Sequence, residues 1–407
     1  EKERRRSLIV CPASLVYNWQ KEIERFAPEL ETVTITGSAP ERKDIIRHTT
    51  DGQILITSYD LLKRDVEYYK NIVFAVQVID EAQYIKNAGT QAAKGVKKIT
   101  AAFKLALTGT PIENRLSELW SIFDYLMPGF LYTYQKFREE IETPIVVNKD
   151  ENKMERLQRM IRPFILRRLK GDVLKDLPEK LEENVYAKME GEQLALYDAH
   201  VQQMKQMLDG KSEAEFKSNK IQILAELTKL RQLCCDPALL FEDYKGESAK
   251  VQMCMDLIGN AVHGGHKVLL FSQFTTMLDR LAEQLKKLGI DYYMLTGSVN
   301  KEKRMQMVDS FNKDDVPVFC ISLKAGGTGL NLTAADIVIH YDPWWNVAVQ
   351  NQATDRAHRI GQKNVVTVYK LVSQGTIEEK KLAEQVLEGE GMDSVVFTKE
   401  EIMELLG

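Results

Sequence analysis

Short apolar runs without polar alternation constrain the fold of this sequence most. A strand of that kind must be covered on both faces, as the strands of parallel sheets are. Between residues 7 and 107, amphipathic stretches separate four such runs, at 8–11, 54–57, 75–79 and 105–107. The pattern predicts buried parallel strands connected by helices, which is an α/β fold of the doubly wound kind.

The same rhythm returns downstream. Further apolar runs occupy residues 267–271, 318–321 and 337–340. After the first of them, a helix with one core-facing side is predicted by apolar residues at helical spacing, namely Leu278, Leu281, Leu285 and Leu288. A chain of 407 residues with 44% hydrophobic content is too long for one ordinary core. We therefore expect two α/β units, each with a parallel sheet.

Charged helical pattern dominates between these regions, and apolar strand-like runs are scarce there. An apolar stripe at helical spacing, formed by Ile221, Leu224, Leu227, Leu230 and Leu233, predicts a core-facing helix side. The expected organisation is a first lobe at 1–130, a helical insertion and linker at 131–247, a second lobe at 248–385 and an acidic, mixed tail at 386–407.

Composition narrows the class of protein. The chain has 55 Lys and Arg against 59 Asp and Glu, a net charge of −4, so any nucleic-acid contact must come from local patches. The five cysteines include no C-x-x-C pair, which favours a reducing compartment over a disulfide framework or zinc site. No apolar run approaches the ~18 residues of a membrane span. We expect an intracellular protein without membrane contact, cytoplasmic if bacterial and nuclear if eukaryotic.

Acidic residues follow the third apolar run, where residues 78–79 lead into Asp80-Glu81-Ala82-Gln83. Ligands bind at the carboxyl edge of open α/β sheets. An Asp there can hold Mg²⁺ through water, and an adjacent Glu can orient or deprotonate an attacking water. The alternative is a solvated acidic turn.

The next apolar run leads into Thr108-Gly109-Thr110-Pro111. Small hydroxyl residues in a tight turn suit a switch between a nucleotide site and a mobile neighbouring lobe. Pro111 also fits the start of a helix whose apolar side is Leu116, Leu119, Trp120 and Phe123. The two interpretations are compatible, because a sensor turn is also a turn.

Two arginines stand out in the second lobe. Arg356 and Arg359 are three apart, so on a helix they would project from nearly the same face, as two guanidinium groups aimed at one phosphate chain must. A pair of surface arginines is the alternative. The glycines of the nearby segment 324–332 would permit close backbone approach to phosphates. The presence of both the arginine pair and the glycine-rich segment in one lobe favours a nucleotide site.

The motifs together resemble one family. DEAQ at 80–83, LTGTPIENRLSELWSIFDYL at 107–126, RPFILRRLK at 162–170, KVLLFSQF at 267–274, SLKAGGTGLNL at 322–332 and DRAHRIGQ at 355–362 stand in the order found in Swi/Snf-related ATPases. The resemblance runs from about residue 8 to 382. It implies two RecA-like lobes with helical protrusions, ATP and Mg²⁺ at the cleft between the lobes, and tracking along duplex DNA without strand separation.

The resemblance also implies roles for individual residues. Asp80 would hold magnesium, Glu81 would orient water, and Arg356 and Arg359 would be fingers from the second lobe. Nucleotide neighbours would be Gln83, Gly327, Gly329 and Asp355. Sequence-independent DNA contacts would come from Pro12, Ser14, Thr57, Ser58, Ser272, Gln273, Thr296, Gly297, Lys324 and Trp345. Trp345 could instead be a core anchor, because buried aromatic packing is the common alternative.

The sequence departs from the family pattern at two places. Gln83 stands where many relatives have His, a variant that resembles bacterial members. No G-x-x-x-x-G-K-S/T loop is present, although a nucleotide-hydrolysing lobe needs one. The string Gly210-Lys211-Ser212 has Lys205 where the loop needs glycine and is interpreted as a solvated turn. In the family the loop lies upstream of the strand at Ser7, so we expect a fragment that is itself inactive in ATP hydrolysis.

Three functions remain open at this stage. The first is a duplex DNA motor, in which the full-length protein hydrolyses ATP. The second is a helicase-like RNA remodeller, which the strings at 322–332 and 355–362 argue against. The third is a DNA-binding scaffold that has lost hydrolysis, which the intact Asp80, Glu81, Arg356 and Arg359 argue against. The sequence leaves the displaced protein partner open.

Overall fold

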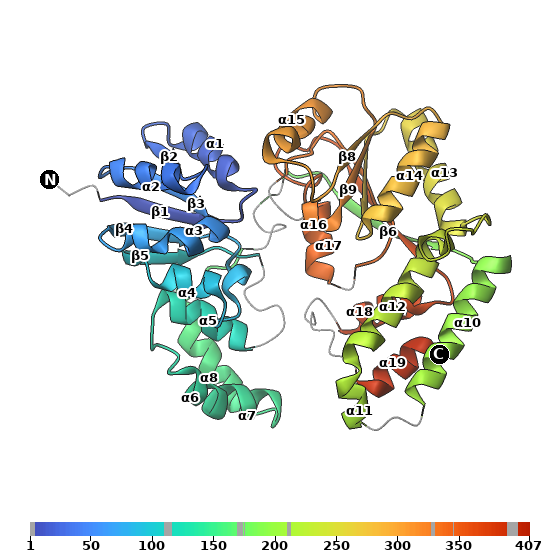
Figure 1. Ribbon diagram of the computed structural model, residues 1–407, viewed down its shortest axis with the longest axis horizontal. Helices are drawn as coiled ribbons and strands as arrows, with labels where there is room; N and C mark the ends of the chain where they lie inside the picture. The colour runs from blue at the N-terminus through green and yellow to red at the C-terminus, as the bar shows by residue number, and fades with distance from the viewer. Residues whose placement is uncertain are drawn as a thin grey trace. The chain divides into compact units, whose positions relative to one another are not determined.

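The computed structural model describes residues 5–109, 116–168, 174, 176–209, 213–326, 330–344, 346–388 and 398–407. The chain divides into two compact units, Glu1–Lys170 and Gly171–Gly407. Figure 1 shows a sheet with flanking helices in each. The boundary falls within the segment 131–247, where a helical insertion and the linker between the lobes were expected. The first helices of that segment belong to unit 1 and its later ones to unit 2.

Unit 1 is built on a five-stranded sheet in the order β2-β3-β1-β4-β5. Every neighbouring pair is parallel. The strands are β1 (Ser7–Cys11), β2 (Thr32–Thr34), β3 (Ile54–Ser58), β4 (Val73–Ile79) and β5 (Thr100–Ala106). The predicted parallel sheet is therefore confirmed, and β1, between β3 and β4, is its central strand.

Helices cover both faces of this sheet. Alternate residues of β1 enter different cores: Ile9 packs with Val16 of α1 on one face, while Leu8 packs with Leu62 of α3 on the other. This split is the two-residue period of a strand buried on both sides. The helices that flank the sheet are α1 (Val16–Phe26), α2 (Ala39–His48), α3 (Tyr59–Asp65), α4 (Gln91–Lys97) and α5 (Leu116–Leu126).

The last strand of unit 1 differs from the prediction. Residues 105–107 were expected to be buried, but β5 is an edge strand with neighbours on one side only. Leu105 is 40% exposed and Phe103 is 58% exposed. Apolar side chains at the edge of a sheet can remain accessible because the strand pairs on one side only.

A small helical subdomain completes unit 1. Its helices α6 (Tyr134–Phe137), α7 (Thr143–Val146) and α8 (Glu151–Ile161) follow α5. Phe137 of α6 and Leu157 of α8 pack against Trp120 and Phe123 of α5. The predicted inward side of α5 is thus confirmed at Leu119, Trp120 and Phe123, all of which are buried.

Unit 2 contains a six-stranded sheet in the order β6-β11-β10-β7-β9-β8, parallel throughout. Its strands are β6 (Lys180–Ala187), β7 (Val268–Ser272), β8 (Tyr292–Leu295), β9 (Val318–Ser322), β10 (Ile337–His340) and β11 (Val366–Ser373). The three predicted strands are confirmed as β7, β9 and β10. Strand β6 was not predicted, because its residues are charged and mostly exposed and it lies at the edge of the sheet.

Two cores cover the faces of this second sheet. One joins β7 to α13 and α14, and the other joins the opposite side of β7 to α15 and α17. A third cluster is all helical and joins α10, α12, α18 and α19. The helices of unit 2 are α10 (Gly191–Leu208), α11 (Glu213–Ser218), α12 (Lys220–Cys235), α13 (Ala249–His263), α14 (Thr275–Lys287), α15 (Lys301–Phe311), α16 (Leu323–Gly326), α17 (Val347–Thr354), α18 (Ile377–Glu388) and α19 (Lys399–Leu406).

The predicted stripe on α12 is only partly correct. Leu227, Leu230 and Leu233 are buried, but Leu224 is 38% exposed and Ile221 is 86% exposed. A helix turns by about 100° per residue, so positions three apart drift by about 60° at each step and cannot share one face over four steps. Similarly, Leu288 lies just past the end of α14 and is exposed.

The tail ends in a docked helix. In α19, the side chains of Ile402, Leu405 and Leu406 are buried in the helical cluster of unit 2. A capping box between Thr398 and Glu401 begins this helix. Among the described helices of the chain, none combines the length and apolarity needed to cross a bilayer.

Candidate active site

The acidic motif lies at the carboxyl edge of the unit 1 sheet, as predicted. Asp80 directly follows β4, and its N–H donates to the Val10 carbonyl of β1 at 2.8 Å. The next residue, Glu81, is in the left-handed region with φ of 53°, an uncommon conformation for a residue with a Cβ. Its N–H donates to Asp80 Oδ1 at 2.9 Å, which stabilises the sharp turn.

Two further side chains hold Asp80. The Trp19 indole Nε1–H donates to Asp80 Oδ2 at 2.8 Å, and the Tyr59 hydroxyl donates to the Asp80 carbonyl at 2.8 Å. Burial raises the pKa of the Tyr59 phenol well above its ordinary value, so the hydroxyl remains a donor. The Tyr59 ring also stacks on Tyr84, with centroids 5.0 Å apart. Hydrogen bonds from several parts of unit 1 thus hold the acidic turn.

A chain of hydrogen bonds joins Glu81 to the turn after β5. Gln83 Nε2 donates to Glu81 Oε2 at 2.7 Å, and Thr108 Oγ1 donates to Gln83 Oε1 at 3.1 Å. The structure therefore brings Thr108 of the predicted sensor turn to the acidic motif through Gln83. Thr110 and Pro111 of that turn lie outside the described residues.

A cavity of about 700 Å³ in unit 1 opens onto these groups. Its polar wall includes Asp80, Glu81 and Thr108, and its apolar wall includes Leu119 and Phe123. This volume is in the range of ligand pockets. Arg167 and Arg168 also line the cavity, and both are exposed. The two adjacent cations were the available signal in the sequence, but the family motif at 162–170 predicted no role for them.

The donor set of the cavity fits magnesium. Asp80 and Glu81 are both partly exposed. Each carboxylate oxygen of Asp80 accepts one hydrogen bond, Oδ1 from the Glu81 N–H and Oδ2 from the Trp19 indole, and a carboxylate oxygen has a further lone pair. Across the described residues no group of three or more His, Cys, Asp or Glu side chains could form a metal cage. Mg²⁺ usually binds through one or two carboxylates, several waters and substrate phosphates, which is what two adjacent carboxylates allow.

The arginines of unit 2 are not on a helix, which corrects the sequence argument. Helix α17 ends at Thr354, so Arg356 and Arg359 lie in the turns that follow, and the same-face inference was wrong. Arg356 is only 8% exposed. Arg359 is partly buried, and its Nη1 donates to the Leu330 carbonyl at 3.2 Å. The Gly-rich segment therefore adjoins the arginine segment, although Gly327 and Gly329 themselves lie outside the described residues.

Polar contacts within unit 2 fix this arginine segment. Gln362 Nε2 donates to the Ala335 carbonyl at 2.8 Å, and His358 Nε2 lies 2.7 Å from the Pro178 carbonyl. Gly361 has φ of +103°, which a residue with a side chain rarely adopts. Asp355, the fourth predicted nucleotide neighbour, follows the end of α17 and is partly exposed.

A buried histidine supports the end of α17. His340 of β10 is fully buried, and its Nε2 lies 2.8 Å from Thr354 Oγ1. Burial lowers the pKa of His340 to about 3, so the ring is neutral near pH 7. The neutral ring can therefore share one hydrogen bond with the last residue of α17, immediately before Asp355.

Several predicted DNA contacts in unit 1 are buried. Thr57 and Ser58 are both within the core, and the Ser58 hydroxyl accepts the Leu61 N–H at the start of α3. Their side chains are not accessible to phosphate, which corrects the prediction for these two residues. Pro12 is also buried, whereas Ser14 is partly exposed.

Of the predicted DNA contacts in unit 2, some are buried and others are at least partly exposed. The buried Ser272 hydroxyl donates to Asp342 Oδ1 at 2.5 Å, so Ser272 is not a surface contact either. The Gln273 N–H also donates to Asp342, and the Gln273 side chain is partly exposed. Thr296 is partly exposed and Gly297 is exposed. The backbone of Lys324 lies in α16, while its side chain and all of Trp345 are outside the described part of the chain.

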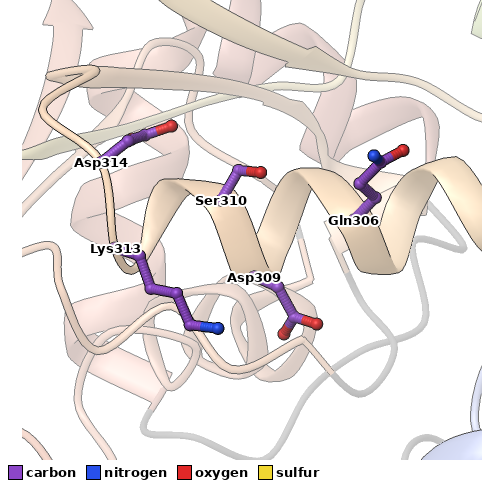
Figure 2. A pocket seen from close by; sticks show the side chains of 5 residues that line it. All are labelled: Gln306, Asp309, Ser310, Lys313 and Asp314. Atoms are coloured by element: carbon purple, nitrogen blue, oxygen red, sulfur yellow. The ribbon is translucent and has the colours of Figure 1, made fainter.

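A second hollow, of about 540 Å³, lies along α15 (Figure 2). Its wall consists of Gln306, Asp309, Ser310, Lys313 and Asp314, none of which is a predicted site residue. Asp314 already accepts a hydrogen bond from the Tyr293 hydroxyl at 2.6 Å. We therefore place the candidate chemistry at the acidic motif of unit 1 and not on α15.

Comparison with known proteins matches this architecture. The SNF2-related domain model matches residues 1–239, and the helicase conserved C-terminal domain model matches residues 249–361. The class is therefore a helicase-related protein with two parallel α/β units. The chain belongs to the SNF2 family of ATP-dependent helicases and translocases.

The relatives are longer than this chain. YwqA of Bacillus subtilis, whose name describes an ATP-dependent helicase/translocase, is 39% identical over 97% of the chain and 44% of its own length. An uncharacterized ATP-dependent helicase of Mycoplasma genitalium is 41% identical over 92% of the chain and 36% of its own length. MOT1, a TATA-binding protein-associated factor of Saccharomyces cerevisiae, is 35% identical over 92% of the chain and 23% of its own length. The chain spans less than half the length of these relatives.

Solved structures of similar chains come from Sulfolobus solfataricus. The SWI2/SNF2 ATPase core in complex with double-stranded DNA is 37% identical, with 95% of this chain and 81% of that chain covered and a TM-score of 0.45. A second structure, of the SWI2/SNF2 ATPase core domain, is 35% identical. It covers 99% of this chain and 84% of that chain, with a TM-score of 0.48.

Proposed function

We propose that this protein is an ATP-driven motor that tracks along duplex DNA and remodels protein–DNA complexes without separating the strands. The observation that carries the proposal is the hydrogen-bonded network of Asp80, Glu81, Gln83 and Thr108 at the carboxyl edge of a parallel sheet. Family membership supports the use of ATP. A relative in complex with double-stranded DNA and a relative named for association with a TATA-binding protein support the choice of substrate.

In this mechanism the unit 1 residues prepare hydrolysis. Magnesium would neutralise charge on the transferring phosphate, and Asp80 would hold it through water. Glu81 would orient the attacking water and accept a proton from it. The Gln83 amide fixes Glu81 Oε2, and Thr108 fixes Gln83 in turn. Thr108 would thus report changes in the turn after β5 to the water-orienting carboxylate.

The unit 2 arginines would supply positive charge to a nucleotide held by unit 1. Arg359 has to exchange the Leu330 carbonyl for phosphate oxygens to do so, while the buried Arg356 supports the segment. Such a charge stabilises the transition state of phosphoryl transfer. Hydrolysis would then depend on the conformation of unit 2, as a motor requires.

DNA contacts in this proposal are directed to the phosphate backbone. Ser14 in unit 1, and Gln273, Thr296 and Gly297 in unit 2, are at least partly exposed and can present hydroxyl, amide or backbone groups. Lys324 and Trp345 remain proposed contacts by family resemblance. Binding of this kind is independent of sequence and weakens with salt.

Steady-state ATPase assays of the full-length protein test the proposal. We expect duplex DNA to stimulate turnover more than single-stranded DNA or duplex RNA. The protein should displace the third strand of a DNA triplex and leave the underlying duplex paired. Greater stimulation by RNA would favour the RNA remodeller, and DNA binding without turnover would favour the scaffold.

A second assay concerns residues 1–407 alone. They contain no G-x-x-x-x-G-K-S/T string, so no described segment offers the amide cradle and Lys that hold a triphosphate in line. We propose that these residues by themselves do not hydrolyse ATP, with or without DNA. Robust turnover by the 407-residue chain would place the phosphate-binding element within it and refute this part of the proposal.

A further inference from the structure

Trp19 is a donor to the carboxylate that we assign to magnesium. Its indole Nε1–H lies 2.8 Å from Asp80 Oδ2, although the two residues are 61 positions apart in sequence. The ring is partly buried and packs with Ile9, Val16 and Ile56 on one face of the unit 1 sheet. A hydrogen bond to a carboxylate is short and strong compared with a neutral one. The contact therefore fixes which lone pairs of Asp80 remain for a metal-bound water.

The same tryptophan is tied to the loop between β1 and α1. The loop residues 12–15 leave the carboxyl end of β1, which pairs with β4 next to Asp80. The Leu15 N–H donates to the Pro12 carbonyl at 2.9 Å, and the Trp19 N–H donates to the Leu15 carbonyl at 2.9 Å. Consecutive turns thus connect the loop to the indole, so a displacement of the loop shifts the Asp80 donor.

We propose that Trp19 is a positioning residue that makes magnesium binding at Asp80 respond to DNA at the β1–α1 loop. This inference rests on the proposed function, because it takes Asp80 as the magnesium carboxylate and Ser14 as a DNA contact. DNA that orders the loop holds the indole against Asp80 Oδ2 and favours the metal-binding orientation. By linkage, magnesium and nucleotide then favour DNA binding by the same factor.

Trp19→Phe is the variant that tests this assignment. It retains an aromatic ring in the cluster and removes the N–H donor. Trp120→Phe is the matched control, because the Trp120 indole donates to the Tyr132 carbonyl in the same unit but contacts neither Asp80 nor the β1–α1 loop. A second variant, Trp19→His, keeps a ring N–H that can donate to the carboxylate.

The measurement is the affinity of the full-length protein for a non-hydrolysable ATP analogue, titrated with Mg²⁺ in the presence and absence of duplex DNA. In the wild type, DNA should lower the Mg²⁺ concentration needed for tight binding. Trp19→Phe should raise that concentration roughly tenfold and abolish the DNA effect, because a charge-assisted hydrogen bond is lost. Affinity without Mg²⁺ should stay within about twofold of wild type. Trp19→His should recover part of both effects.

A double-mutant cycle separates this role from a packing role. In an Asp80→Asn background, Trp19→Phe should have little further effect on the Mg²⁺ titration, because its partner is already changed. Full additivity, or equal behaviour of Trp19→Phe and Trp120→Phe, would overturn the inference. Absence of DNA-stimulated turnover in the wild type would refute the proposed motor independently, since that result requires no variant.

Discussion

The acidic residues of unit 1 and the arginines of unit 2 are held in different ways. Asp80 and Glu81 accept hydrogen bonds from Trp19 and Gln83, and both remain partly exposed to a cavity. In unit 2, Arg356 is buried and Arg359 donates to the Leu330 carbonyl. The first set is oriented and accessible, whereas the second is committed to contacts within its own unit.

This difference suggests that the two units have unequal tasks in a reaction cycle. Groups that bind metal and water must be oriented before substrate arrives, because preorganised dipoles need no rearrangement during reaction. A charge that acts only at one stage can be held in an alternative contact until that stage. Breaking the contacts on each side should therefore have different consequences for binding and turnover.

The largest effect is expected for Arg359→Ala in the full-length protein. In the proposed mechanism Arg359 acts only in the transition state, so its loss should lower turnover by ~10³ and leave DNA affinity nearly unchanged. Steady-state ATPase kinetics and DNA-binding titrations measure the two quantities, with the exposed Arg47→Ala of α2 as control. A loss of DNA binding with turnover retained would make Arg359 a DNA contact instead.

Glu81→Gln should have the next largest effect. The change keeps the side-chain size but removes the carboxylate that we propose as the water-orienting group, so turnover should fall by ~10² or more while nucleotide affinity stays near that of wild type. Glu67→Gln, on the exposed Glu67–Lys70 pair of the same unit, is the control. Turnover within a few fold of wild type would contradict the role of Glu81.

Local information in the sequence predicted the acidic motif and the strands β1, β3, β4, β5, β7, β9 and β10, but it missed β2, β6, β8 and β11. Fully apolar runs specified β1, β3 and β7, and Asp80 had to follow β4 at the carboxyl edge. It failed at β6, whose charged residues form a strand only because β11 pairs with it over eight residues. Edge pairing is a tertiary property that local periodicity does not encode.

Tertiary contacts also explain the errors around the candidate site. The spacing of Arg356 and Arg359 suggested a helix, but contacts of Gln362 and His358 with distant carbonyls stabilise turns there. Thr57, Ser58 and Ser272 have the hydroxyls of phosphate-binding residues, yet each lies at the buried end of a strand. The Trp19–Asp80 contact joins positions 61 apart, so no short motif could reveal it.

The next prediction concerns the stability of unit 2. Burial lowers the pKa of His340 to about 3 from an ordinary value of 6.5. The unfolded state therefore binds the proton first, and the contribution of neutral His340 is complete above pH 6.5 and lost as pH falls towards 3. Wild type should lose about 2 kcal/mol by pH 5 from this group.

Chemical denaturation of the full-length protein between pH 7.5 and pH 5 measures this loss. His340→Gln keeps a hydrogen-bonding end for Thr354 and does not titrate, so it should flatten the pH dependence of the unit 2 transition. His263→Gln, at the exposed end of α13, should leave the slope as in wild type. Equal slopes for His340→Gln and wild type would show that another group is responsible.

The smallest expected effect on DNA binding is at Gln273, which neighbours Ser272 in unit 2. Both residues were predicted to contact DNA. Gln273→Ala removes the side-chain amide of a partly exposed residue and should weaken duplex DNA binding by roughly threefold at every sequence, because a neutral phosphate contact contributes modestly. The salt dependence should stay steep and unchanged, since no cation is lost.

Ser272→Ala instead leaves the buried Asp342 without its hydroxyl donor. Burial raises the pKa of Asp342, and the hydroxyl counteracts that shift. The Ser272 variant should therefore lower the unfolding free energy of unit 2 by about 1–3 kcal/mol and affect DNA only through the Gln273 turn. DNA-binding titrations at several salt concentrations measure the affinity, and denaturation curves measure the unfolding free energy of unit 2. A Ser272 variant that loses DNA affinity at unchanged stability would restore Ser272 as a direct contact and require this turn to open when DNA binds.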